Sequence, residues 1–330
     1  MFKNYSRRDF LRVMGVTAGG LALTACEPLL NSFGRHPGST PITGPMPYRV
    51  LGQTGDSVSL FGLGGEAAIE GADAELAAEI INEAIDLGVN YLDTSAWYPG
   101  GSNQGRSERN IGQVLQTRRK EVFLATKSHG LNYSAVMSHV EDSLSNLKTD
   151  QIDLYQLHNV RFQTQLDQIF DKDDGALKAM ERLREQHVIR HIGITGHYDS
   201  QILLQAINQH PFDAILLSLN VADKWDQPFQ EELLTTALDK KMGIIAMKVA
   251  GKGDLVNKGS GEAQLTMERL MWYVYSFPVS CAIIGIHSVS ELHEDLDITA
   301  RFPGSYSADE LAALEDDAYP FRALGNQWKK

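Results

Sequence analysis

Short apolar segments alternate with amphipathic segments along most of this chain. The apolar segments have the length of buried strands, and the amphipathic ones repeat their apolar positions with the 3.6-residue period of a helix. The predicted strands cover 60–65, 89–95, 121–127, 151–158, 189–195, 212–219, 243–249 and 280–286. The clearest predicted helices cover 74–88, 107–118, 134–147, 176–186 and 263–277. Strands that alternate with helices in this way predict a parallel sheet.

The number of strand–helix units favours a (β/α)8 TIM barrel, a fold that typically needs ~250 residues. A doubly wound sheet is the alternative, and it usually carries a glycine-rich turn between its first strand and first helix. The glycines at 62–65 form too short a segment for that turn, and no helix follows directly. Two short apolar runs around the turn at 53–56 predict a β-hairpin before the first strand. We therefore predict one barrel domain over residues 47–330 with a short N-terminal hairpin.

The composition narrows the kinds of partner that the domain can have. The 330 residues are 43% hydrophobic and 22% charged, which is ordinary for a globular protein, and the formal net charge is −12. Residues 1–25 carry a net charge of +3, so the remaining chain carries −15. A domain this acidic is a poor partner for nucleic acid, which needs a basic surface. The two cysteines, Cys26 and Cys281, are too few for a disulfide framework or a cysteine-based metal site, and we expect no metal.

The start of the chain resembles an export signal. Two arginines at 7–8 precede Phe-Leu and a weakly apolar run that ends in Leu-Thr-Ala-Cys, which is similar to a twin-arginine signal followed by a lipoprotein cleavage site. An ordinary amphipathic helix would explain neither the small residues of this run nor the cysteine after it. We expect residues 1–25 to be a signal peptide, Cys26 to be lipidated, and residues 26–46, rich in Pro, Gly and Ser, to be a flexible tether.

These features predict a location for the protein. The twin-arginine translocation machinery would carry the folded domain out of the cytoplasm. The lipid on Cys26 would then hold it at a membrane surface, at the periplasmic or extracytoplasmic face. The sequence does not predict an oligomeric state.

Polar residues stand at the ends of three consecutive predicted strands, where catalytic groups of such barrels lie. Asp93 ends one strand and is followed by Tyr98, Lys127 ends the next, and His158 ends the third. Each residue alone has an ordinary structural explanation. Together they have a chemical logic: a tyrosine can donate a proton, and a nearby ammonium lowers its pKa. A carboxylate pairs with that ammonium, and an imidazole can hydrogen-bond a substrate oxygen.

This set closely resembles the catalytic residues of the aldo-keto reductase family. The matching segments are DTSAWY, ATK and LYQLHN, and the successive catalytic positions are 5, 29 and 31 residues apart. The resemblance implies an oxidoreductase in which a hydride passes from C4 of NADP or NAD to the carbonyl carbon of an aldehyde, ketone or sugar. Tyr98 would donate the proton and His158 would bind the oxygen, while Lys127 and Asp93 would adjust the pKa of Tyr98.

The family resemblance also indicates where the cofactor would bind. Thr195 and Gly196 replace the usual Ser-Asn pair, Met247 replaces an aromatic ring, and Lys248 follows it. The glycine-rich loop that starts at Gly251 would hold phosphate groups. The remaining cofactor positions are Gly65, Asp93, His287 and Glu291.

Glu291 aligns with an arginine that binds the 2′-phosphate in many family members. Its carboxylate would repel that phosphate, and Asp295 ends the same acidic segment. We therefore expect weak discrimination between the two nucleotides, or a tilt toward NAD. The pocket loops carry Trp97 and His129 among other aromatic and histidine side chains, but no charged clamp that would define the substrate.

The weaker cofactor positions leave a second hypothesis open. The protein could instead be a non-enzymatic barrel that keeps a nucleotide and acts as a redox-sensing or binding lipoprotein.

Overall fold

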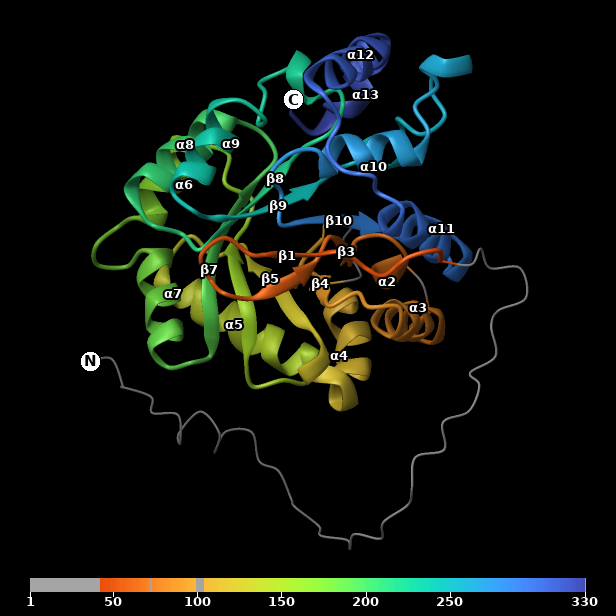
Figure 1. Ribbon diagram of the computed structural model, residues 1–330. Coiled ribbons are helices and arrows are strands. Elements are labelled where there is room, and N and C mark those ends of the chain that lie inside the picture. Colours follow the sequence, from red (N-terminus) through yellow and green to blue (C-terminus); the bar gives the residue numbers. More distant parts are fainter. Residues whose placement is uncertain (1–41, 72, 99–103, 330) are drawn as a thin grey trace, which may run out of the picture. The chain divides into compact units, whose positions relative to one another are not determined.

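Eight parallel strands form a closed barrel, which confirms the predicted (β/α)8 fold and excludes the doubly wound sheet. The computed structural model describes residues 42–71, 73–98 and 104–329, and the statements below concern these residues. Around the barrel the strands follow the order β10-β3-β4-β5-β6-β7-β8-β9, so the last strand pairs with the first (Figure 1). The predicted signal peptide, Cys26 and most of the predicted tether lie outside the described residues.

Each predicted strand segment corresponds to one strand of the barrel, and two of the strands end one residue later than predicted. The strands are β3 (Phe61–Gly64), β4 (Tyr91–Asp93), β5 (Phe123–Ser128), β6 (Ile152–Leu157), β7 (Ile189–Gly196), β8 (Ala214–Ser218), β9 (Gly243–Met247) and β10 (Cys281–Gly285). The predicted hairpin is also present, as antiparallel β1 (Tyr48–Val50) and β2 (Ser57–Ser59).

Helices surround the barrel, and all five predicted ones are present, with ends shifted by a few residues. The helices are α2 (Ala68–Gly71), α3 (Ala74–Asp86), α4 (Arg106–Arg118), α5 (Tyr133–Leu147), α6 (Gln163–Ile169), α7 (Ala176–Glu185), α8 (Ser200–Gln209), α9 (Glu232–Asp239), α10 (Met267–Tyr275), α11 (Val289–Ala300), α12 (Ala308–Ala318) and α13 (Arg322–Gly325). Several begin with a side-chain cap, such as Asp73 before α3 and Asn132 before α5.

The barrel interior is apolar through most of its depth and polar at one end. Because side chains alternate along a strand, every second residue points inward. Tyr91, Phe123, Leu154, Leu216 and Ile245 belong to this inner cluster. Above this cluster, Asp93 follows Tyr91 as the next inward position on β4, and Lys127 follows Ala125 on β5, so these two residues begin the polar layer at the C-terminal end of the strands.

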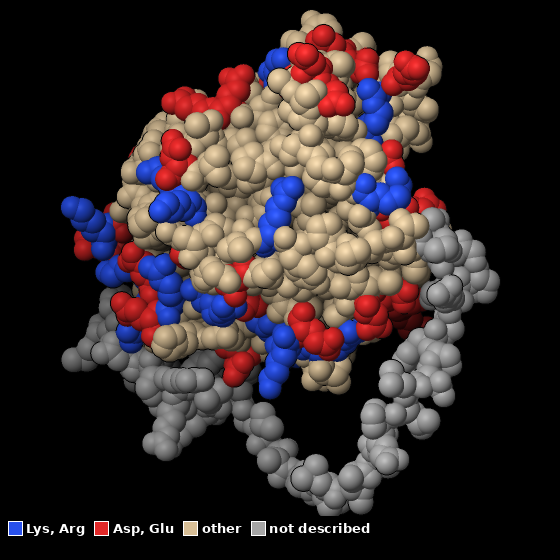
Figure 2. All heavy atoms as spheres, in the orientation of Figure 1, with Lys and Arg blue, Asp and Glu red and all other residues tan. Residues whose placement is uncertain are grey.

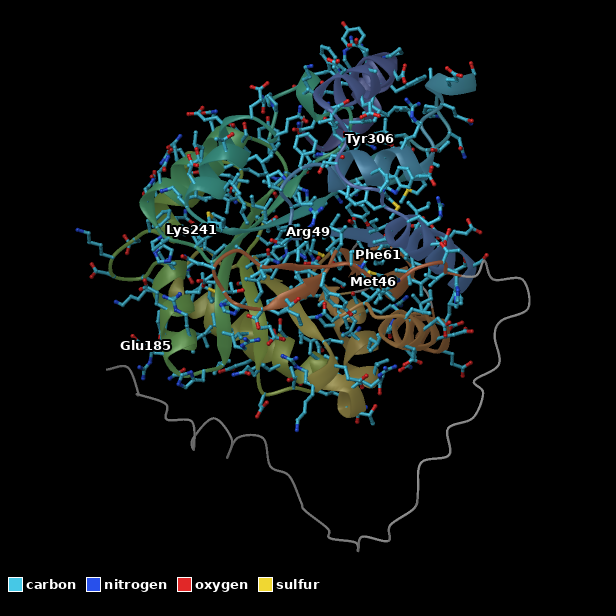
Figure 3. All side chains as sticks on the ribbon, in the orientation of Figure 1. Met46, Arg49, Phe61, Glu185, Lys241 and Tyr306 are labelled. Atoms are coloured by element: carbon cyan, nitrogen blue, oxygen red, sulfur yellow. The ribbon has the colours of Figure 1, made fainter. Side chains whose placement is uncertain are left out.

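The hairpin closes the opposite end of the barrel. Leu51 and Val58, from the turn and β2, are fully buried in the inner cluster. Arg49 donates hydrogen bonds to the carbonyl oxygens of Tyr275, Phe277 and Val279, which join β1 to the segment between α10 and β10 (Figure 3). Figure 2 shows one basic side chain near the centre of this face among uncharged residues, with most of the other acidic and basic side chains toward its edge.

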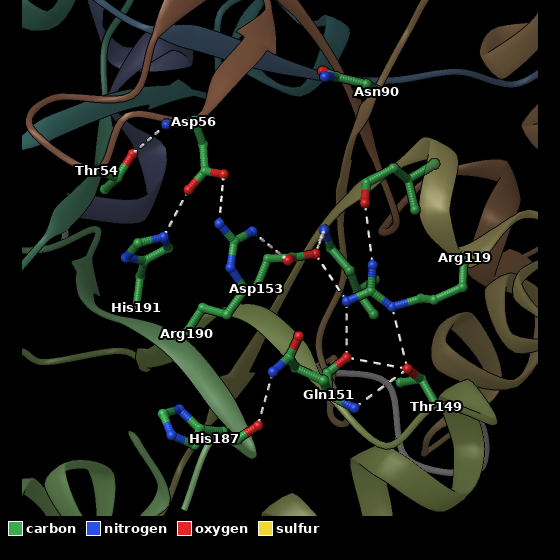
Figure 4. A network of polar contacts seen from close by, with 12 residues as sticks. Thr54, Asp56, Asn90, Arg119, Thr149, Gln151, Asp153, His187, Arg190 and His191 are labelled. Carbon is green, nitrogen blue, oxygen red and sulfur yellow. Dashed lines mark hydrogen bonds and ion pairs between the residues drawn. The ribbon is translucent and has the colours of Figure 1, made fainter. Parts of the chain in front are cut away.

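An ion-pair network also joins the hairpin to the N-terminal ends of the strands (Figure 4). Arg190 binds Asp56 of the hairpin turn at 2.6 Å and Asp153 of β6 at 2.7 Å. Arg119 binds the second oxygen of Asp153 at 2.8 Å, and His191 binds Asp56 at 2.7 Å. Each carboxylate thus has two partners, which offsets the cost of removing it from water.

The last residues of the predicted tether contact the barrel. Thr43 donates two hydrogen bonds to Asp297 on α11, and Gly44 packs against Ala300 at the end of that helix. Among the described helices, none combines the length and the apolar character that a membrane crossing requires.

Candidate active site

A buried ion pair lies at the centre of the polar layer. Lys127 Nζ lies 2.5 Å from Asp93 Oδ2 and 2.8 Å from the carbonyl oxygen of Thr94. Lys127 is 3% exposed and Asp93 is 2% exposed. Burial raises the pKa of Asp93, and the adjacent ammonium opposes that shift. The predicted partnership of these two residues is therefore present in the fold.

Tyr98 lies beside this pair on the loop that follows β4. Its ring centroid is 6.0 Å from Lys127 Nζ. We expected the ammonium to lower the pKa of Tyr98, but in the structure this pKa is raised. Burial raises the pKa of Tyr98 well above 10, and the carboxylates of Asp93 and Glu66 add to this rise. Lys127 is neutralised by Asp93, so its effect on the phenol is outweighed, and Tyr98 is a neutral phenol that holds its proton at pH 7.

His158 belongs to a row of three histidines across the mouth of the barrel. His158 Nδ1 lies 2.8 Å from His129 Nε2, and the rings of His158 and His197 are 5.8 Å apart. Burial lowers the pKa of His158 well below 6.5, that of His129 to about 4 and that of His197 to about 3. All three rings are therefore neutral at pH 7 and available as hydrogen-bond donors and acceptors.

Unpartnered polar atoms next to these histidines fit the carboxamide of a nicotinamide ring. Thr195 Oγ1 and Ser218 Oγ are fully buried and have no hydrogen-bond partner among the described residues. Gln156 lies close enough to Asp93 to favour its charged form, yet its amide atoms make no hydrogen bond of normal geometry with any described residue. Buried polar groups are almost always paired, so these atoms suit a polar ligand.

Three of the predicted cofactor positions are constrained by packing. A Cβ on Gly196 would lie 2.5 Å from the Val160 carbonyl oxygen, so the asparagine usual in the family does not fit on this backbone. A Cβ on Gly65 would lie 2.5 Å from Ser107 Oγ and 2.7 Å from the Asp93 carbonyl oxygen. Met247 is buried in the inner cluster at the end of β9. These residues shape the site without offering a polar side chain to the cofactor.

An acidic residue holds the candidate phosphate loop in place. The loop follows β9 and the acidic residue follows β3, and β10 lies between these two strands. Glu66, which follows β3, binds Lys248 at 2.9 Å and Lys252 at 3.1 Å. Burial opposes ionisation of Glu66, but the two ammonium groups hold its pKa at about 2. Gly251 adopts a φ of +61°, which favours glycine. Lys248 at the end of β9 and Lys252 in the loop are thus both paired with the same carboxylate.

The start of α11 carries less free charge than the sequence suggests. Glu291 accepts a hydrogen bond from the backbone nitrogen of His287 at 2.7 Å, and the His287 ring lies 3.2 Å from the same oxygen. Burial raises the pKa of Asp295 to about 8, and the carboxylates of Glu291 and Glu294 add to the rise. Asp295 is therefore mostly neutral at pH 7, so we correct our expectation that it adds charge there.

Sequence reasoning missed Gln156, Ser218 and His197 as members of the site. Gln156 and His197 each lie two residues from a predicted site residue on the same strand, so the two-residue alternation could have identified them. The apolar run around Ser218 offered no such signal. Among the described residues, no group of three or more His, Cys, Asp or Glu side chains is arranged to hold a metal ion.

Comparisons with known proteins match the chain to one family of oxidoreductases. The model of the Aldo/keto reductase family matches residues 60–272. An uncharacterized oxidoreductase of Bacillus subtilis, YqkF, is 30% identical over 244 residues, which cover 70% of this chain and 74% of that protein. L-galactose dehydrogenase of Arabidopsis thaliana is 26% identical over 284 residues, which cover 75% of this chain and 86% of that protein.

A solved structure shows the same fold. The aldo-keto reductase AKR11C1 from Bacillus halodurans, in its holo form, superposes with a TM-score of 0.68 at 23% identity, covering 82% of this chain and 96% of that one. The family model matches more than half of this chain, and the chain therefore belongs to the aldo/keto reductase family.

Proposed function

We propose that this protein reduces an aldehyde, ketone or sugar carbonyl with NADPH or NADH, and that Tyr98, Asp93, Lys127 and His158 carry the reaction. The observation that carries the proposal is the buried Lys127–Asp93 pair beside Tyr98, with His158 at the end of the neighbouring strand β6. A buried ion pair contributes little net stability, so its presence in a polar pocket favours a chemical role.

The residues divide the reaction among them. A nicotinamide cofactor, when bound, supplies the hydride that reaches the carbonyl carbon. His158, a neutral imidazole, donates a hydrogen bond to the carbonyl oxygen and stabilises the negative charge that develops on it. Tyr98 donates the proton that this oxygen takes up. Lys127 stabilises the phenolate that remains, and Asp93 keeps Lys127 in place.

Three regions at the C-terminal end of the barrel would hold the cofactor. Thr195 and Ser218 offer unpartnered hydroxyls to the carboxamide. Lys248 and Lys252 now bind Glu66, and they would release it and bind the diphosphate in its place. The start of α11, with His287 and Glu291, would face the adenosine end.

The mouth of the site favours an uncharged polar substrate. Trp97 is 44% exposed and Phe162 is 52% exposed, and the Phe162 ring packs against Tyr198. The His129 ring packs against Trp97 and against His158, and it is neutral at pH 7. Aromatic faces with neutral hydrogen-bonding groups suit a sugar-derived carbonyl, a class to which the similarity with L-galactose dehydrogenase also points.

Purified full-length protein tests the function directly. Absorbance at 340 nm is followed with NADH or NADPH and a panel of aldoses, ketoses, aliphatic aldehydes and aromatic aldehydes. We expect oxidation of the cofactor with at least one member of the panel. Tight cofactor binding without turnover on any carbonyl would contradict the proposal and favour the non-enzymatic, nucleotide-holding alternative.

We expect the protein to discriminate only weakly between NADPH and NADH, or to prefer NADH. By the family resemblance, Glu291 aligns with an arginine that binds the 2′-phosphate in many family members, and a ribose hydroxyl could donate a hydrogen bond to its carboxylate. His293, the other nearby histidine, binds Glu83 on α3 at 2.8 Å and does not supply free positive charge. Fluorescence titration with both reduced cofactors measures the preference. A preference for NADPH above about 100-fold, equivalent to ~2.7 kcal/mol, would contradict this prediction.

We further propose that the domain is exported by the twin-arginine route and anchored through a lipid on Cys26. The support is the N-terminal sequence itself, from the arginine pair at 7–8 to the cysteine. Metabolic labelling with a fatty-acid probe should mark the wild-type protein but not Cys26→Ser. Cys281 is the control cysteine that should not carry the label. It is fully buried, and burial raises the pKa of its thiol well above 9. Equal labelling of wild type and Cys26→Ser would reject the anchor.

A further inference from the structure

We propose that His129 is a positioning residue that fixes the tautomer of His158, so that the proton of His158 is on Nε2 and available to the substrate oxygen. The proposal rests on the proposed function, because it specifies how one of its four catalytic residues is prepared. It is carried by the contacts of a single atom, His129 Nε2.

That atom faces a group that can only accept a hydrogen bond. His129 Nε2 lies 3.1 Å from the carbonyl oxygen of Trp97. An unprotonated Nε2 would place its lone pair against the lone pairs of this oxygen, which is unfavourable in a pocket with little water. The Ser95 hydroxyl also lies 3.3 Å from His129 Nε2, but it donates its proton to the Trp97 oxygen at 3.0 Å and therefore meets His129 as an acceptor. His129 therefore carries its proton on Nε2.

A second contact of His129 Nε2 determines which nitrogen of His158 carries the proton. His158 Nδ1 lies 2.8 Å from His129 Nε2. Two protonated nitrogens cannot face each other at this distance, so Nδ1 of His158 accepts from the shared N–H of His129. Because burial keeps His158 neutral, its single proton must be on Nε2. The opposite tautomer would present a lone pair to the carbonyl oxygen and could not stabilise its developing charge.

His129 also joins the loops that carry the proton donor and the oxygen-binding group. Its ring packs edge-on against Trp97, at 4.9 Å between centroids, and Trp97 immediately precedes Tyr98. The His129 and His158 rings are 4.2 Å apart. A side chain after β5 thus contacts both the loop after β4 and the end of β6, which should limit how far Tyr98 and His158 move relative to each other.

The tautomer can be measured without any turnover. Full-length protein labelled with ¹⁵N-histidine gives separate ring-nitrogen signals, and the His158→Gln spectrum assigns those of His158 among the ten histidines. We expect a protonated Nε2 and an unprotonated Nδ1 on His158 at pH 7. A proton on Nδ1 would overturn the proposal even if the enzyme is fully active.

Two substitutions of similar length separate positioning from packing. In His129→Gln the amide NH₂ lies near the position of Nε2 and can still donate to His158, whereas His129→Met fills the space without a donor. We expect His129→Met to lose the single tautomer and to lower kcat/KM for the carbonyl about tenfold, the effect of one lost hydrogen bond. The Kd of the cofactor should not change. His129→Gln should recover both the tautomer and most of the activity.

The outcomes keep this proposal distinct from the proposed function. If His129→Met retains one Nε2-protonated tautomer and the wild-type kcat/KM, His129 does not position His158. If both variants lose activity equally while keeping the wild-type tautomer, the role of His129 is packing, and the proposal is again rejected. A protein without turnover would contradict the proposed function, but the nitrogen signals would still decide the tautomer.

Discussion

Tyr98→Phe is expected to lower the turnover of carbonyl reduction at least ~100-fold and to leave cofactor affinity unchanged. The substitution removes only the hydroxyl, the group that would give its proton to the substrate oxygen in the proposed mechanism. The ring, which lies 6.0 Å from Lys127 Nζ, is retained, so the shape of the pocket should not change. Steady-state kinetics with the best carbonyl substrate and fluorescence titration of the cofactor measure the two effects separately.

Tyr155→Phe is a matched control for this experiment. Tyr155 is a fully buried tyrosine on β6 outside the predicted catalytic set, so loss of its hydroxyl should have little effect on turnover. Near-native activity of Tyr98→Phe would show that another group donates the proton and that the assigned mechanism is wrong.

Lys127→Met should have two large effects, one on turnover and one on stability. The ammonium that stabilises the phenolate of Tyr98 is lost, so we expect turnover to fall about 100-fold or more. The Asp93 carboxylate, 2% exposed, is left without its partner. Removing one member of a buried pair typically costs about 3–5 kcal/mol of unfolding free energy. Kinetics and denaturant unfolding measure the two effects on the same preparation.

The double variant Lys127→Met/Asp93→Asn separates these two effects. The neutral amide leaves no unpaired charge in the pocket, so we expect most of the lost stability to return while turnover stays low. If turnover returned together with stability, Lys127 would be a structural residue and its place in the mechanism would be wrong. A fully active Lys127→Met protein would lead to the same conclusion.

The sequence predicted the barrel because its signals are local. A buried strand needs a short apolar run and a covering helix needs an apolar stripe, and both can be identified within one segment such as 121–127 or 134–147. The C-terminal ends of parallel strands share one edge of the barrel, so residues that end three consecutive strands must lie close together. For this reason Asp93, Lys127 and His158 could be placed in one site before any contact was known.

The charge states of the side chains were predicted less well than the fold, because they depend on burial. Asp295 was expected to be a charged residue, but it is buried on α11 and its pKa is raised to about 8. Tyr98 was expected to have a lowered pKa, but the Lys127 charge that would lower it is offset by Asp93 at 2.5 Å. Desolvation is set by the side chains that cover a group, which come from distant segments.

The sequence by itself therefore determined the order of strands and helices, the closed barrel that they build and which polar residues gather at the C-terminal ends of its strands. Only the tertiary structure decided how those residues pair. Glu66 binds Lys248, 182 residues later in the chain, because barrel closure brings the loop after β3 next to the loop after β9. The row of His129, His158 and His197 likewise forms from three separate strand ends. Such contacts depend on the pairing of strands that are distant in the sequence and on the conformation of the loops between them, and the apolar and polar pattern within one segment specifies neither.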